Sequence, residues 1–180
     1  MNTKMTQLAL ALGALVMTGG VWAQTTSTQS TMAVKATIVA ECAVANGGGL
    51  SFGTLTMLDK SNAQQASADE MTVSTFPAIC TNGTASPTFT YASANAANLT
   101  DFRLKGATIG TEFIAYTLYP STNLSRAAIV GGAAVDHPGF TATGETIELP
   151  LSARILAVDK ATKSAQAYSD TITITAGWTP

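Results

Sequence analysis

Two cysteines, Cys42 and Cys80, are the residues of this chain whose chemistry is easiest to assign. In an exported protein an even number of cysteines is most simply paired, so the sequence predicts a Cys42–Cys80 disulfide. Free thiols or a redox site are the alternatives. On the chain-entropy model, closing this loop removes about 4 kcal/mol of unfolded-state entropy. The role expected for the pair is therefore structural.

The single histidine, His137, is the residue that a hydrolase or a zinc site would have to use. It lies in the sequence Asp-His-Pro-Gly, which is typical of a turn. A triad with Asp136 and a serine is not supported, because adjacent residues on an extended chain point to opposite sides and no Gly-x-Ser-x-Gly motif is present. One histidine and two paired cysteines cannot supply four zinc ligands. We expect His137 in a turn or at the surface, and we expect no enzymatic activity, no cofactor and no metal site.

The N-terminal residues have the pattern of a secretory signal peptide. Lys4 supplies a positive charge, residues 8–17 form an apolar stretch, and residues 21–23 (VWA) provide a cleavage site. The sequence therefore predicts a signal peptide over residues 1–23, export through the periplasm, and a mature chain that starts at Gln24. No later stretch is apolar and long enough to span a bilayer, and the mature chain suits one domain.

The charge of the chain argues against nucleic acid as a partner. The formal net charge is −2 at pH 7, only 11% of the residues are charged, and no basic cluster stands out. A surface of small neutral residues instead suits packing against copies of the same chain.

Alternating apolar and polar residues predict short strands throughout the exported chain. No segment has a sustained helical periodicity, so the expected fold is an all-β sandwich. The expected strands are residues 32–42, 50–55, 71–80, 88–92, 102–105, 112–119, 147–155 and 168–178.

The last predicted strand has the pattern of a half-buried strand with no successor. Its buried face is expected to carry Ile172, Ile174, Ala176 and Trp178, which alternate with threonines. Without a further strand its backbone would form an open edge. Residues 24–31 favour β-structure but have almost no apolar groups, and alone they would be disordered. This combination suggests a sheet that another molecule completes.

Five segments occur in order along the chain: residues 41–44 (ECAV), 50–55 (LSFGTL), 79–83 (ICTNG), 114–119 (IAYTLY) and 167–178 (AYSDTITITAGW). Together with the signal peptide they resemble the spore coat protein U domain, which also forms the subunits of archaic chaperone–usher pili. The resemblance covers the chain from about Lys35 onward. It implies an incomplete immunoglobulin-like β-sandwich, here residues 36–180, that is completed by a donor strand from a neighbouring subunit.

The resemblance also implies which residues and partners take part in assembly. Residues 24–35 would be the donor extension, with Thr26, Thr28, Ser30, Met32 and Val34 facing inward, and the last strand would be the acceptor edge. A periplasmic chaperone would cap the groove and an outer-membrane usher would export the subunit. Head-to-tail addition does not close, so it gives a filament. The expected function is a structural subunit of a cell-surface pilus that supports adhesion and biofilm formation; the alternative is a secreted binding module or fibre-tip adhesin with a self-contained sandwich.

Overall fold

The structure, a computed structural model, describes residues 30–179. The expected signal peptide, and Thr26 and Thr28 of the expected donor extension, lie outside the described residues. The chain divides into two units after Ala36. The strands described below all belong to the second unit.

Ten strands and one short helix are found among the described residues, and every strand pairing is antiparallel. The larger sheet has the order β1 (Cys42–Val44), β4 (Glu70–Cys80), β8 (Ile147–Ile155), β7 (Phe113–Tyr119), β6 (Phe102–Gly106) and β9 (Tyr168–Ser169). The second sheet pairs β5 (Ala85–Ser93) with β10 (Ile172–Thr179), and β2 (Leu58–Asp59) pairs with β3 (Gln64–Gln65). The helix is α1 (Ala157–Lys160).

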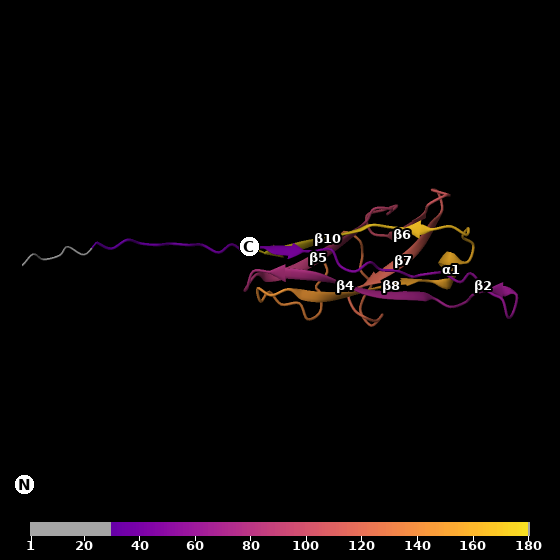
Figure 1. The fold of residues 1–180 in the computed structure, drawn as a ribbon, viewed down its shortest axis with the longest axis horizontal. Helices are drawn as coiled ribbons and strands as arrows, with labels where there is room; N and C mark the ends of the chain where they lie inside the picture. The colour runs from indigo at the N-terminus through magenta and orange to yellow at the C-terminus, as the bar shows by residue number, and fades with distance from the viewer. Residues whose placement is uncertain (1–29, 180) are drawn as a thin grey trace, which may run out of the picture. The chain divides into compact units, whose positions relative to one another are not determined.

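The two sheets form the layers of a sandwich, with β5 and β10 in one layer and β4 and β8 in the other (Figure 1). Alternate residues of each strand point into the space between them. Phe76 of β4 joins the layers, because its ring centroid lies 5.8 Å from that of Phe89 and 6.2 Å from that of Tyr91, both on β5. The predicted all-β sandwich is confirmed.

Two of the expected strands are wrong. Residues 30–41 form no strand and their side chains are exposed; only Cys42–Val44 pairs, with β4. A strand needs a neighbour for its backbone groups. Residues 30–40 have none among the described residues, and only the Glu41 carbonyl accepts a bond, from the Thr81 N–H at 2.9 Å. Residues 50–55 also form no strand, although Leu50, Phe52 and Leu55 pack partly buried against the core.

The last predicted strand is divided into β9 and β10, and its end does not follow the expected alternation. Ile172, Ile174 and Ala176 pack against the core as expected. The pairing with β5 shifts register between Gly177 and Thr179, which is the signature of a bulge. Trp178 lies in this bulge and is 37% exposed, so its predicted place on the buried face is wrong.

His137 lies in the expected turn but not at the surface. The Phe140 N–H donates to the His137 carbonyl oxygen at 3.2 Å, and the His137 side chain is buried. Its ring packs edge-on against Phe76 and Phe89, with centroid distances of 5.5 and 5.8 Å. The expectation of a surface histidine is therefore wrong, because the turn folds back over the aromatic core.

Candidate functional site

The outer edge of β10 is unpaired. Within residues 30–179, β10 has a hydrogen-bonded neighbour on one side only, which is β5. In an antiparallel pair, the backbone N–H and C=O groups of two opposed residues either bond to each other or both point away from the partner strand. The Tyr91 carbonyl accepts from the Gly132 N–H at 2.8 Å, and Phe89 exchanges two 2.9 Å backbone hydrogen bonds with Val135. The backbone groups of Tyr91 and Phe89 therefore point away from β10.

This pattern shows which backbone groups of β10 are free. Ile174 lies opposite Tyr91, and Ala176 lies opposite Phe89. Their N–H and C=O groups therefore point toward the open edge, as do those of Ile172 two residues earlier. A strand laid along this edge would find a regular row of donors and acceptors.

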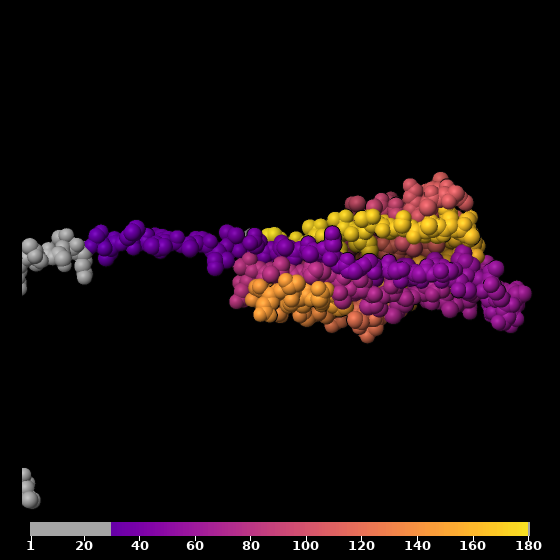
Figure 2. All heavy atoms as spheres, in the orientation of Figure 1, coloured from indigo at the N-terminus to yellow at the C-terminus, as the bar shows by residue number. Residues whose placement is uncertain are grey.

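A groove runs beside the open edge, and we define it as two adjoining cavities of about 430 and 620 Å³. Residues 44–57 form one wall and residues 164–174 form the other, and Figure 2 shows the first segment running beside the C-terminal residues along the sandwich. Both cavities are lined by Leu50, Phe52, Leu104 and Asp170, which places their junction at these residues.

The first wall is attached to β4 at one end and unpaired along the rest. Gly48 donates its N–H to Thr75 at 3.1 Å and accepts from the Ser74 hydroxyl at 2.6 Å. A side chain at Gly47 would not fit, because its Cβ would lie 2.7 Å from the Phe76 Cα. Beyond this point residues 49–56 make no backbone–backbone hydrogen bond with any described residue. The groove therefore has an unpaired backbone along both of its walls.

A fixed polar group lies at the junction of the two cavities. The Tyr116 hydroxyl donates to Asp170 Oδ2 at 2.6 Å, while the Asn95 side-chain amide and the Thr171 N–H donate to Oδ1 at 3.0 and 2.8 Å. Burial, and then the bond and charge of Asp170, raise the pKa of Tyr116. Asp170 is the one charged side chain among the described residues that line the groove.

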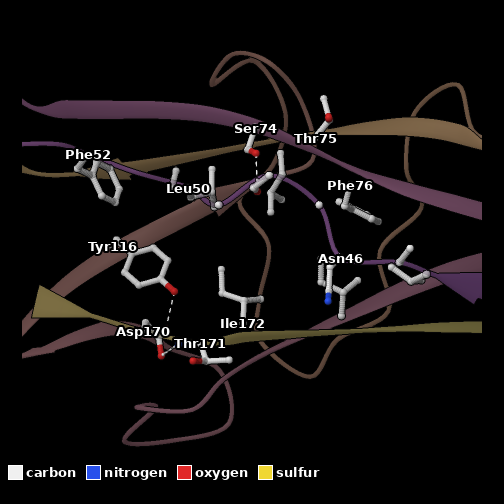
Figure 3. Close-up of a pocket in the computed structure, with 18 of the residues that line it drawn as sticks. Asn46, Leu50, Phe52, Ser74, Thr75, Phe76, Tyr116, Asp170, Thr171 and Ile172 are labelled. Carbon is white, nitrogen blue, oxygen red and sulfur yellow. Dashed lines mark hydrogen bonds between the residues drawn. The ribbon is translucent and has the colours of Figure 1, made fainter.

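Figure 3 shows how the side chains meet in the first cavity. Leu50 and Phe52 approach from the first wall, Ile172 and Asp170 lie opposite them, and Tyr116 reaches across to Asp170. Phe76, Leu151 and Ala153 form the apolar floor. No group of three or more histidine, cysteine or acidic side chains that could hold a metal ion occurs among residues 30–179.

The sequence model of the spore coat protein U domain matches residues 28–175, most of the chain. The chain belongs to this family. Nine chains of solved structures also match, and no curated protein sequence does. One solved structure is a chaperone–tip adhesin complex described as vital for synergistic activation of CFA/I fimbriae biogenesis. It is 15% identical over 62% of this chain and 36% of that chain, with a TM-score of 0.42; the chain thus spans about a third of that protein.

In this spore coat protein U domain the predicted disulfide is present. Cys42 and Cys80 are bonded, and they are also opposed in the pairing of β1 with β4. The disulfide therefore fastens the start of the first wall to the larger sheet. Among residues 30–179, no helix is long and apolar enough to cross a membrane.

Two of the four acceptor residues expected from the sequence line the groove. Ile172 and Ile174 line it, whereas Ala176 packs on the core beyond it and Trp178 is 37% exposed. The opposite wall and Asp170 were not predicted as site residues. The apolar side chains at positions 50, 52 and 55 were the sequence signal that could have indicated the first wall. That residues 164–174 lie across the groove from them is visible only in the tertiary structure.

The expected donor residues that are described are exposed. Met32 and Val34 are 87% and 90% exposed, and Ser30 is exposed as well. The apolar alternation continues past the predicted extension through Ala36 to Ile38, which is 85% exposed. Ile38 was not predicted as a donor residue, because the sequence interpretation assigned it to a strand of its own domain.

Proposed function

We propose that this chain is a structural subunit of a cell-surface fibre that is assembled by donor-strand exchange. The carrying observation is the groove, which runs along β10 and presents Leu50, Phe52 and Ile172 among polar groups. It lies between the unpaired backbone of residues 49–56 and the free edge of β10. An inserted strand satisfies these backbone groups and fills the groove with alternate side chains, as in other cases of β-augmentation. Membership of the spore coat protein U family supports the same function.

The donor in this proposal is the N-terminal segment of another subunit. Met32, Val34 and Ile38 are exposed and lie at even-numbered positions of a segment that forms no strand. Large apolar side chains gathered on one exposed face mark an interaction site. The donor extension predicted from the sequence is residues 24–35; in this proposal it continues to Ile38, and the remaining residues up to 180 form the acceptor domain. Each subunit both donates and accepts, so addition continues without closing and gives a filament.

The same groove defines the other partners. A groove beside an open strand edge promotes aggregation if nothing covers it, so a periplasmic chaperone covers it before assembly and an outer-membrane usher passes the subunit outward. The fibre supports adhesion and biofilm formation, and the subunit itself is not an enzyme. Cells that produce a subunit without its donor extension should therefore export little fibre and attach poorly to surfaces.

The test compares the mature chain with a variant that lacks residues 24–38, on a denaturing gel without heating. The mature chain should give a ladder that collapses on heating, and the variant should give only a monomer band. Circular dichroism of both proteins controls for folding. A monomer band from both folded proteins would contradict the proposal and favour a self-contained binding module.

A further inference from the structure

We propose that the Tyr116–Asp170 pair sets the register of the incoming strand by accepting only a small residue, Ala36 of a second copy. This inference rests on the proposed donor-strand exchange and specifies its partner segment. Val34 and Met32 of the second copy then lie opposite Ile172 and Ile174, and its Ile38 lies opposite Tyr168.

The direction of the strand follows from the two ends of the groove. β1 contacts β10, and its last residue, Val44, lines the first cavity, so β1 bounds the groove toward the C-terminal end of β10 (Figure 1). The donor segment leads into the folded body of its own subunit within a few residues of Ile38, since β1 begins at Cys42. The C-terminal end of the donor must therefore leave at the other end, near residues 164–168, and the donor lies antiparallel to β10.

The pairing of faces follows from the free backbone groups. Opposed residues in an antiparallel pair point to the same face of the sheet. The inward residues of the acceptor edge are the even ones: Asp170 bonds to Tyr116, and Ile172 and Ile174 pack on the core. Even donor residues, which carry the apolar side chains, must therefore lie opposite them. The donor then forms its hydrogen bonds with the free groups of Ile172 and Ile174.

The direction and the pairing of even residues still allow registers that differ by two residues, and the environment of Asp170 selects one of them. Its carboxylate accepts three hydrogen bonds at the junction of the cavities, so it cannot move aside without losing them. A shift by two residues in either direction would place Val34 or Ile38 against this carboxylate. A branched aliphatic side chain there would remove water from a charge without replacing its interactions. Ala36 has no atoms beyond Cβ and leaves the polar group undisturbed.

A longer shift fits the chemistry less well. Placing Ser30 at Asp170 would satisfy the polar junction, but Thr28 would then face Ile172 in the apolar first cavity. Val34 and Ala36 would lie opposite Gln166 and Ser164, at the polar end of the second cavity, and Ile38 would lie beyond the groove. The register with Ala36 at the junction instead places Val34 and Met32 over Phe76 and Leu151 in the first cavity. It brings Ile38 to the second cavity, which is lined by Leu55 and Ile114.

Cysteine pairs across the groove test the register. Three cysteine pairs are made in the mature chain with Asp170 and Ala36 intact: Val34→Cys with Ile172→Cys, Met32→Cys with Ile172→Cys, and Val34→Cys with Ile174→Cys. The proteins are oxidised, heated and run without reductant. Directly opposed positions have the Cα separation that a disulfide needs. We expect a heat-resistant covalent ladder from Val34→Cys with Ile172→Cys and little from the other two pairs.

The outcomes separate this inference from the proposed function. A covalent ladder from either of the other two pairs would overturn the register but leave donor-strand exchange intact. Absence of the heat-sensitive ladder from the unmodified chain would contradict the proposed function itself. A cross-link found only within the monomer would overturn the assignment of the donor to a second copy.

A volume substitution gives a second test that needs no cross-link. Ala36→Leu should reduce the amount of ladder by about tenfold, because overpacking at a fixed position weakens the fit. Ala33→Leu adds the same volume to the outward face, and the ladder should persist. Equal ladders from both variants would show that Ala36 does not meet a fixed group, and would overturn the inference.

Discussion

The Tyr116 hydroxyl on β7 donates a 2.6 Å hydrogen bond to the carboxylate of Asp170, which directly follows β9 and lies two residues before β10. The bond ties the larger sheet to the start of the open edge, and the Tyr116 side chain is buried. Hydrogen bonds to a charged group contribute about 1.5–3 kcal/mol. The pair therefore stabilises the wall of the groove at the position where we place the donor's small residue.

Tyr116→Phe should lower the free energy of unfolding by about 2 kcal/mol, because it removes this bond and little else. Tyr91→Phe is the matched control, since the Tyr91 hydroxyl is buried and has no hydrogen-bond partner among the described residues. That variant should lose no stability. Urea denaturation of the monomer measures both, and an equal loss in the two variants would show that the Tyr116–Asp170 bond contributes nothing.

Replacing both Cys42 and Cys80 with serine should lower the free energy of unfolding by about 4 kcal/mol. The disulfide joins residues 38 apart in the sequence, so its loss frees a long loop in the unfolded chain. Denaturation with and without reductant provides the control, because the variant should be insensitive to reductant. A wild-type protein whose midpoint is also unchanged by reductant would contradict the structural role of the disulfide.

Acid should destabilise the fold through His137. Burial lowers the pKa of His137 to about 4, below its ordinary value of 6.5, so the fold favours the neutral ring. Protonation then favours the unfolded chain, and stability present above pH 6.5 is lost as the pH falls toward 4. Between pH 7 and pH 5 the loss from this residue should be about 2 kcal/mol.

The variant His137→Leu isolates this effect from the titration of the carboxylates. The difference in stability between wild type and variant should change by about 2 kcal/mol between pH 7 and pH 5. Parallel stability curves for the two proteins over this range would mean that His137 is accessible to protons in the folded state.

Gly47→Ala should lower the free energy of unfolding by about 1–3 kcal/mol, because its Cβ would collide with β4 and displace the first wall. Gly49→Ala is the control, since a Cβ there meets nothing within 4 Å. Thermal denaturation compares the two. If Gly47→Ala were as stable as Gly49→Ala, the close packing of this wall on β4 would be wrong.

Much of the fold was predictable because its strands depend on local pattern. The alternation in residues 71–80 and 147–155 predicts strands that the structure has as β4 and β8, where each apolar face meets a sheet across the core. The Cys42–Cys80 disulfide was also predictable, since two cysteines in an exported chain have one simple pairing. The alternation in the last strand likewise identified Ile172 and Ile174 as inward residues.

The errors in the strand assignments have one physical cause, which is that an alternating pattern does not show whether a segment finds a hydrogen-bonded neighbour. Residues 32–41 alternate as strongly as β8, yet they form no strand, because strand formation requires a hydrogen-bonded partner. The alternation of Trp178 with Ile174 fails for a related reason, since a bulge depends on the register of β5.

The sequence by itself determined most of the strands, the inward positions of Ile172, Ile174 and Ala176, the disulfide and the resemblance to the spore coat protein U family. Only the tertiary structure decided that residues 44–57 lie across from β10, that Asp170 meets Tyr116 at the junction of two cavities, and that His137 is buried. These features join residues far apart in the chain, and contacts of that kind depend on how the two sheets pack and not on local pattern.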